Sequence, residues 1–198
     1  MLNYALSGET GADAAIAFHG GLSNVASDFN QTVSSSVLIV SGGEDSQDST
    51  SDIKLMEAAL NSGGSLWEIQ RYSDVEHGFT DIFSSRYNAY VEERSWPSTI
   101  KFLQKTFDEI ELAPSIPKDL TGEAFPYSDP ADGSALNGYI TVPEGEGPFP
   151  AVVIIHNADG INEYEETRAT MLAEMGFVGL AADVYGPMMA EVDMTNRT

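Results

Sequence analysis

The sequence predicts an α/β fold in which a mostly parallel sheet carries helices on both faces. Short apolar segments alternate along the chain with amphipathic ones, which is typical of strands followed by covering helices. Several of the short segments are almost continuously apolar, as strands buried on both faces of a parallel sheet are. The 198 residues, of which 42% are apolar, suffice for one domain with a substantial core.

Six strands are expected from these short segments. Two of the segments alternate apolar and polar residues, at 66–72 and 136–142, whereas the other four are nearly continuous apolar runs. The full set is 14–18, 36–40, 66–72, 136–142, 151–155 and 177–182.

Amphipathic stretches between these strands predict the helices. They are residues 52–60, 87–107 and 162–175. Pro97 lies inside the second stretch, so we expect a kink or a restart near Trp96. Asn162, followed three residues later by Glu165, forms a capping-box-like start for the third. The proline-bearing residues 111–120 are expected to be a linker between a first part, 1–110, and a second part, 121–198.

The composition excludes several classes of function. With 31 Asp and Glu against 9 Lys and Arg, the formal net charge of -22 repels nucleic acid and anionic membrane surfaces. The carboxylates are scattered, which favours an acidic surface that aids solubility over a site for a cationic partner. No signal-peptide pattern follows the first methionine and no apolar stretch is long enough to span a bilayer, so we expect a cytoplasmic location.

Four stretches of the sequence resemble one family. VLIVSGGEDSQDS begins at Val37, EHGFTDIFSSRYNAYVEERSWPSTIKFLQKTF begins at Glu76, and GADAAIAFHGGL begins at Gly11. FPAVVIIHNADGINEYEETRATMLAEMGFVGLAADVYG begins at Phe149. Together they resemble the dienelactone hydrolase family of α/β-hydrolases, with its acid turn, His-Gly-Phe loop, oxyanion loop and Asp-x-Tyr-Gly strand.

The resemblance implies a hydrolase of carboxylic esters or lactones with a Cys/Ser-His-Asp triad. It implies that Asp45 is the triad acid and His77 the base. It also places Asn157 and Ala158 in the oxyanion and substrate loop, where the Ala158 N–H would line the oxyanion hole. Asn157 stands where the family commonly has a glutamate. Asp81 stands where dienelactone-cleaving members tend to have a carboxylate-reading arginine, so dienelactone itself is not the expected substrate.

The positions of the acid and base in the predicted sheet agree with this assignment. Asp45 and His77 each follow a strand, and the carboxyl ends of adjacent parallel strands converge. We therefore expect the two side chains within hydrogen-bond reach, about 3 Å apart. The alternative is that Asp45 is a turn residue in an acidic loop and His77 a surface histidine. His19 and His156 also end strands, and without neighbours at metal-ligand spacing they are expected to pack rather than bind metal. No metal or cofactor is expected.

The family elements occur in swapped order, and the nucleophile segment is absent. The sequence has no cysteine and no Gly-x-Ser-x-Gly, and Ser7, Ser41 and Ser65 lack the flanking glycines of a nucleophile elbow. A helix, a strand and the elbow, about thirty to forty residues, are missing. The chain is interpreted as a window across two tandem hydrolase domains, or as a circular permutant that lost its central strand.

Two classes of function remain open on these observations. The first is an ester or lactone hydrolase that acts on a small molecule and takes its nucleophile from residues outside this chain. The second is a non-catalytic remnant or fragment that folds or binds without turnover. In both, strands 14–18 and 151–155 flank the missing strand, so they must pair with each other or leave edges that favour association with a second chain.

Overall fold

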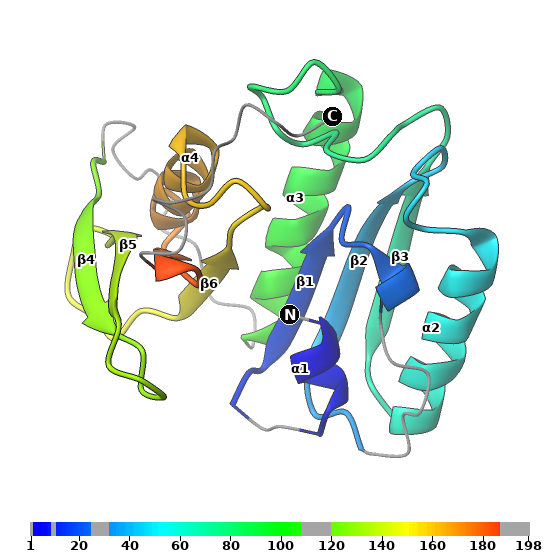
Figure 1. Cartoon of the computed structure of the whole chain (residues 1–198), viewed down its shortest axis with the longest axis horizontal. Coiled ribbons are helices and arrows are strands. Elements are labelled where there is room, and N and C mark those ends of the chain that lie inside the picture. Colours follow the sequence, from blue (N-terminus) through cyan, green and yellow to red (C-terminus); the bar gives the residue numbers. More distant parts are fainter. Residues whose placement is uncertain (1, 9–10, 25–31, 108–119, 187–198) are drawn as a thin grey trace. The chain divides into compact units, whose positions relative to one another are not determined.

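The strands of the chain form two separate sheets in the computed structural model, which describes residues 2–8, 11–24, 32–107 and 120–186 (Figure 1). The chain divides into two compact units, Met1–Ile110 and Glu111–Thr198, instead of the single domain that its length favours. All but the last residue of the expected linker 111–120 lies outside the described residues. Each unit is therefore described by itself.

The sheet of the first unit is parallel throughout. Its strands β1 (Ala14–Phe18), β2 (Ser36–Gly42) and β3 (Trp67–Tyr72) lie in the order β1-β2-β3. The central strand β2 is buried from Val37 to Gly42, which explains its uninterrupted apolar run. The half-buried β3 is an edge strand, as its alternating sequence predicts.

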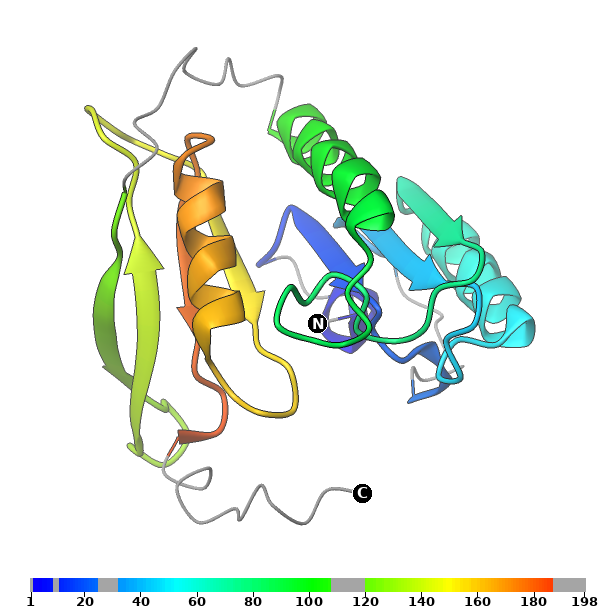
Figure 2. The ribbon, with the colours of Figure 1, turned by 90° about the horizontal axis from the view of Figure 1, so that it is seen from above.

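Helices cover both faces of this sheet, as predicted (Figure 2). Successive strand residues point to opposite faces. Val37 and Ile39 pack with α1 (Leu2–Leu6) and α2 (Thr50–Gly63), while Leu38 and Val40 pack with α3 (Ala89–Thr106). These contacts confirm the α/β class and make two hydrophobic cores, one on each side of the sheet.

The helix boundaries follow from capping residues. The Ser49 side chain and the Asp52 side chain form a reciprocal capping box at the start of α2, and Gly64, with φ 73°, ends the helix. Helix α3 starts after Asn88, whose side chain accepts a hydrogen bond from Val91 N–H. Of the expected kink or restart near Trp96, the restart does not occur, because one helix continues through Pro97. Proline removes a single donor from the ladder, and the buried face of the helix anchors it on both sides of that position.

The sheet of the second unit is mixed rather than mostly parallel. Its order is β4-β5-β7-β6, with β6 and β7 parallel and the other two pairs antiparallel. The strands are β4 (Glu123–Ser128), β5 (Ala135–Thr141), β6 (Ala151–Ile155) and β7 (Val178–Ala182). Strand β4 was not expected from the sequence, because it is largely exposed and contains Pro126. An exposed edge strand needs no apolar run and tolerates proline.

One helix, α4 (Glu163–Ala173), packs on this sheet. Its start confirms the expected capping box of Asn162 and Glu165. It lies so close to β7 that a Cβ on Gly179 would collide with the backbone of Ala169. Glycine is therefore needed at this position for the helix and the strand to approach each other.

Strand β1 is an edge strand of the sheet in the first unit, and β6 is an edge strand of the sheet in the second. The sequence reading of β6 as a strand buried on both faces is wrong, because Val153 is 45% exposed and Ile155 is 42% exposed. An apolar run therefore indicated a strand but not the burial of both of its faces.

Candidate active site

The Asp45 carboxylate and the His77 imidazole are in hydrogen-bond contact. Asp45 Oδ2 lies 3.0 Å from His77 Nδ1, which confirms the expected distance. The Asp45 side chain is fully buried, whereas the His77 side chain is 31% exposed. The other carboxylate oxygen of Asp45 accepts a 2.9 Å hydrogen bond from Gln47 N–H, which fixes the carboxylate plane. An acid thus holds one ring nitrogen of a histidine whose ring is open to solvent.

Backbone hydrogen bonds join the loops that carry these two residues. Beyond the end of the β2–β3 ladder, Gly43 N–H donates to Tyr72 O at 2.6 Å and Glu44 N–H donates to Val75 O at 3.0 Å. A Cβ on Gly42 would collide with the Val75 carbonyl, so glycine permits this approach. Main-chain hydrogen bonds therefore hold the loop that carries Asp45 beside the loop that carries His77, independently of their side chains.

A second carboxylate in the acid loop, Asp48, was not singled out in the sequence. It is fully buried and accepts hydrogen bonds from Leu22 N–H (2.9 Å) and from the Ser41 hydroxyl (2.8 Å). Burial raises the pKa of Asp48, against the lowering effect of these two hydrogen bonds. Since Ser41 donates to Asp48, its hydroxyl serves the loop structure. The Ser7 and Ser65 hydroxyls donate to backbone carbonyls.

Two further residues of the histidine loop have defined positions. Asp81 accepts a 2.9 Å hydrogen bond from Phe83 N–H within a turn. The Arg86 guanidinium donates to the His77 carbonyl at 3.4 Å and lies 3.9 Å from the exposed Glu76 carboxylate. The loop after the histidine is therefore an ordered turn.

The expected oxyanion loop, with Asn157 and Ala158, lies in the second unit. Glu165, almost fully buried, accepts hydrogen bonds from Asn157 N–H (3.2 Å) and Asn162 N–H (3.1 Å). Burial raises the pKa of Glu165, although both of these hydrogen bonds lower it. Sequence reasoning identified Glu165 only as a helix cap. Its hydrogen bond with Asn157 N–H, eight positions earlier in the chain, could not be predicted from the spacing of residues at the helix cap.

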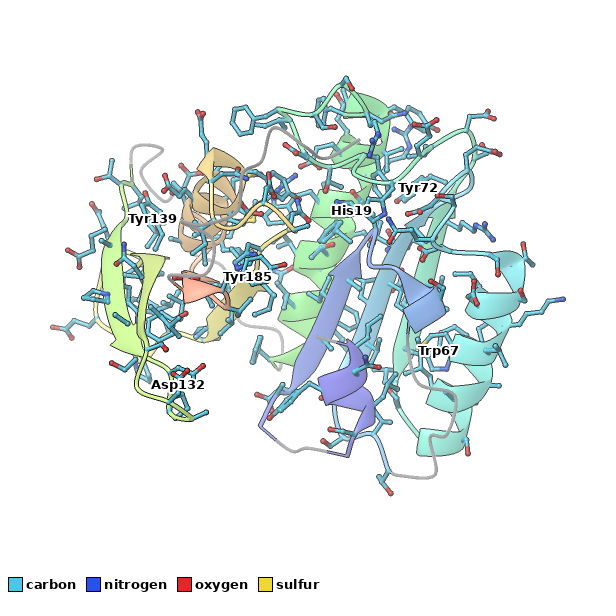
Figure 3. All side chains as sticks on the ribbon, viewed as in Figure 1. His19, Trp67, Tyr72, Asp132, Tyr139 and Tyr185 are labelled. Atoms are coloured by element: carbon cyan, nitrogen blue, oxygen red, sulfur yellow. The ribbon has the colours of Figure 1, made fainter. Side chains whose placement is uncertain are left out.

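His156 is a structural residue, as its expected packing role implies. Its Nδ1 donates to the Asn157 carbonyl at 2.6 Å, and its Nε2 accepts from Val184 N–H at 3.2 Å, so both ring nitrogens are engaged. Burial raises the pKa of the neighbouring Asp183, but hydrogen bonds from Gly186, Asn137 and Tyr185 N–H groups outweigh it and the pKa is lowered. Figure 3 labels Tyr185, one of the residues whose N–H donates to Asp183.

Of the four candidate site residues, Asp45 and His77 meet in the first unit, and Asn157 and Ala158 follow each other in the second. Within the described part of the chain, no three His, Asp or Glu side chains gather as metal ligands. No helix in that part is long and apolar enough to cross a membrane.

The chain is similar to proteins of one family. The model of the dienelactone hydrolase family matches residues 1–107 and 136–197. YghX of Escherichia coli (strain K12), which is named as a hydrolase fragment, is 33% identical over 66 residues, 33% of this chain and 56% of YghX. Esterase EstD of Thermotoga maritima is 42% identical over 66 residues, 33% of this chain and 15% of EstD. The matches thus span only part of these curated relatives.

A solved structure is also similar to part of the chain. It is the crystal structure of the dienelactone hydrolase-like promiscuous phosphotriesterase P91 from metagenomic libraries. The sequence identity is 26% and the TM-score is 0.47, over 53% of this chain and 46% of P91.

Proposed function

The chain belongs to the dienelactone hydrolase family, and from this premise we propose that it supplies parts of the active site of a carboxylic-ester or lactone hydrolase. The observation that supports this most is the 3.0 Å contact between the buried Asp45 carboxylate and His77 Nδ1. An acid that orients a histidine in this way is the arrangement that acyl transfer requires. The similarity to an esterase agrees with an ester substrate.

In the proposed reaction, His77 acts as general base and then as general acid. Asp45 accepts a hydrogen bond from His77 Nδ1–H, which leaves Nε2 of the same ring to take the proton of the attacking hydroxyl or thiol. The nucleophile then bonds to the ester carbonyl carbon, and the carbonyl electron pair moves onto its oxygen. The oxyanion electron pair then re-forms the carbonyl, the bond from its carbon to the ester oxygen breaks, and His77 gives its proton to the departing alkoxide. Water that His77 deprotonates then attacks the acyl intermediate, and His77 returns this proton to the departing nucleophile. A backbone N–H at the Ala158 position would stabilise the oxyanion in a site of this kind.

The nucleophile is proposed to lie outside these residues. The sequence contains no cysteine and no Gly-x-Ser-x-Gly, and the Ser41 hydroxyl is held by Asp48. The same observations favour the second candidate, a non-catalytic remnant that folds or binds without turnover. On the hydrolase account, Asp81 would repel a substrate carboxylate placed at its position, so an uncharged ester or lactone is the proposed substrate.

The open edges of β1 and β6 are proposed to bind a strand of a second chain when the central strand is absent. Neither strand contains a charged residue or proline, whereas the opposite edge of each sheet has Glu68 and Arg71 in β3 or Pro126 in β4. Charges and proline on an edge strand oppose pairing with other chains. The two sheets thus each have one protected edge and one unprotected edge.

The test compares this chain with a longer native frame that includes the missing helix, strand and elbow. We expect the chain alone to hydrolyse activated esters no faster than its His77→Ala variant, because the covalent route is closed. The longer frame should show turnover that His77→Ala lowers by about a thousandfold or more. In sedimentation velocity, the chain alone should associate and the longer frame should not. A well-folded longer frame without turnover would favour the remnant instead.

A further inference from the structure

A second histidine, His19, contacts the loop that carries His77. It follows β1 directly, and Figure 3 labels it at the carboxyl end of that strand. Its ring meets the His77 ring edge-on, with centroids 5.0 Å apart, and the Phe79 ring with centroids 5.4 Å apart. Its Nε2 lies 3.1 Å from the Thr80 hydroxyl oxygen. One side chain therefore contacts three of the four residues from 77 to 80.

The backbone at His19 holds the residue in an uncommon conformation. Its φ is 39°, in the left-handed region that residues other than glycine rarely adopt. Its N–H nevertheless donates to Val40 O at 2.8 Å, so the residue is tied to the central strand. A conformation of this kind is disfavoured by about 1 to 3 kcal/mol and persists where the surroundings fix it, often at functional sites.

The chemistry of the contact also distinguishes His19 from a residue that merely fills space. His19 is 4% exposed, and Thr80 is fully buried. Burying an imidazole and a hydroxyl is unfavourable unless they bond to each other or to other polar groups. An apolar ring would fill the same space without that requirement. The polar pair therefore adds a directional link between the end of β1 and the histidine loop.

We propose that His19 is a positioning residue that fixes the orientation of the His77 ring. The inference rests on the proposed function, in which His77 is the base. Asp45 holds the ring at Nδ1 alone, and a ring held at one atom can still tilt about that bond. His19 restricts the tilt by its edge-on contact with the ring and by anchoring Thr80. The direction of Nε2 is fixed as a result, as proton transfer to and from a positioned group requires.

The test measures how fast the His77 Nδ1 proton exchanges with water, by NMR of the 198-residue chain. His19→Phe keeps an aromatic ring but removes the link to Thr80, and Thr80→Val removes the same link from the other side. Both should speed the exchange at least about tenfold, because the ring leaves its bond to Asp45 more often. Trp67→Phe is the matched control, since it also replaces an aromatic side chain by phenylalanine and removes one side-chain hydrogen bond, the 3.0 Å bond from Trp67 Nε1–H to Asn61, at the start of β3. It should leave the exchange rate unchanged.

Exchange in His19→Phe and Thr80→Val at the rate of the unaltered chain would overturn the proposal. So would an equal acceleration in Trp67→Phe, because the effect would then be a general loss of stability. If His19→Phe does not fold, Thr80→Val alone decides. Asp45→Asn separates this proposal from the proposed function: if its exchange rate equals that of the unaltered chain, the Asp45–His77 pair fails whatever the His19 variants do.

Discussion

Each unit has a histidine directly after a strand and a buried carboxylate bonded to a neighbouring loop, but the partners of these groups differ. In the first unit Asp45 bonds to His77, whose ring is 31% exposed. In the second unit Glu165 accepts only backbone N–H groups, and His156 uses both ring nitrogens on the backbone. Only the first arrangement leaves a ring nitrogen for chemistry. Under the proposed function, the identity of the partner, more than burial or residue type, separates a reactive group from a structural one.

Asp48 shows that the distinction holds within a single loop. It lies three residues after Asp45 and is equally buried, yet its partners are Leu22 N–H and the Ser41 hydroxyl. It belongs with the structural carboxylates of the second unit. The contact with an imidazole, and not the position in the acid turn, therefore makes Asp45 rather than Asp48 the candidate for chemistry.

The largest effect on stability is expected from Glu165→Ala. The change leaves Asn157 N–H and Asn162 N–H without their acceptor and opens a cavity, which should destabilise the second unit by about 2 to 4 kcal/mol. Urea unfolding followed by circular dichroism measures the loss. Both tryptophans lie in the first unit, so their fluorescence reports that unit separately.

Glu163→Ala is the matched control for this measurement. Glu163 is exposed in the first turn of the same helix, so its removal should change the unfolding free energy by about 0.5 kcal/mol or less. Equal effects of the two substitutions would mean that the Glu165 carboxylate does not hold the loop and the helix start together.

A smaller effect should appear as opposite pH dependences of the structural carboxylates. Burial raises the folded pKa of Asp48 and Glu165, so their contribution to stability is present below the unfolded pKa and is lost as pH rises through the folded pKa. Burial also raises the pKa of Asp183, but three N–H donors lower it overall. Its contribution is present above the unfolded pKa and is lost as pH falls through the folded pKa.

The isosteric amides test these directions. Unfolding free energies of Asp48→Asn and Asp183→Asn, measured relative to the unaltered chain between about pH 3 and pH 7, should change with opposite slopes. The relative stability of Asp48→Asn should improve as pH rises, and that of Asp183→Asn should worsen. Slopes of the same sign would contradict the account in which burial dominates the pKa of Asp48 and hydrogen bonding dominates the pKa of Asp183.

The sequence predicted the elements whose pattern is local. The strand at β1 was bounded at the residues observed, and the capping box at Asn162 was read from two side chains three positions apart. The distance between Asp45 and His77 followed from the convergence of adjacent parallel strands. In each case the necessary information lay within one element or in the order of neighbouring elements.

What the sequence did not predict depends on contacts that no apolar run or local spacing marks. Strand β4 has no apolar run, because it is exposed and its pairing with β5 supplies its stability. The roles of Asp48 and His19 require residues 26 and 61 positions away. Alternate residues of β6 are exposed, so one face of the strand is uncovered, which an apolar run cannot indicate.

The central claim is that Asp45 serves chemistry while the equally buried Asp48 serves structure. The most direct test is the kcat of the longer native frame with Asp45→Asn and with Asp48→Asn, beside the unfolding free energy of each. We predict that Asp45→Asn lowers kcat by about 10⁴-fold, because the histidine loses its orienting acid. Asp48→Asn should leave kcat within about tenfold, and its change in unfolding free energy should account for any loss of activity. A kcat that Asp45→Asn lowers no more than Asp48→Asn does would contradict the account.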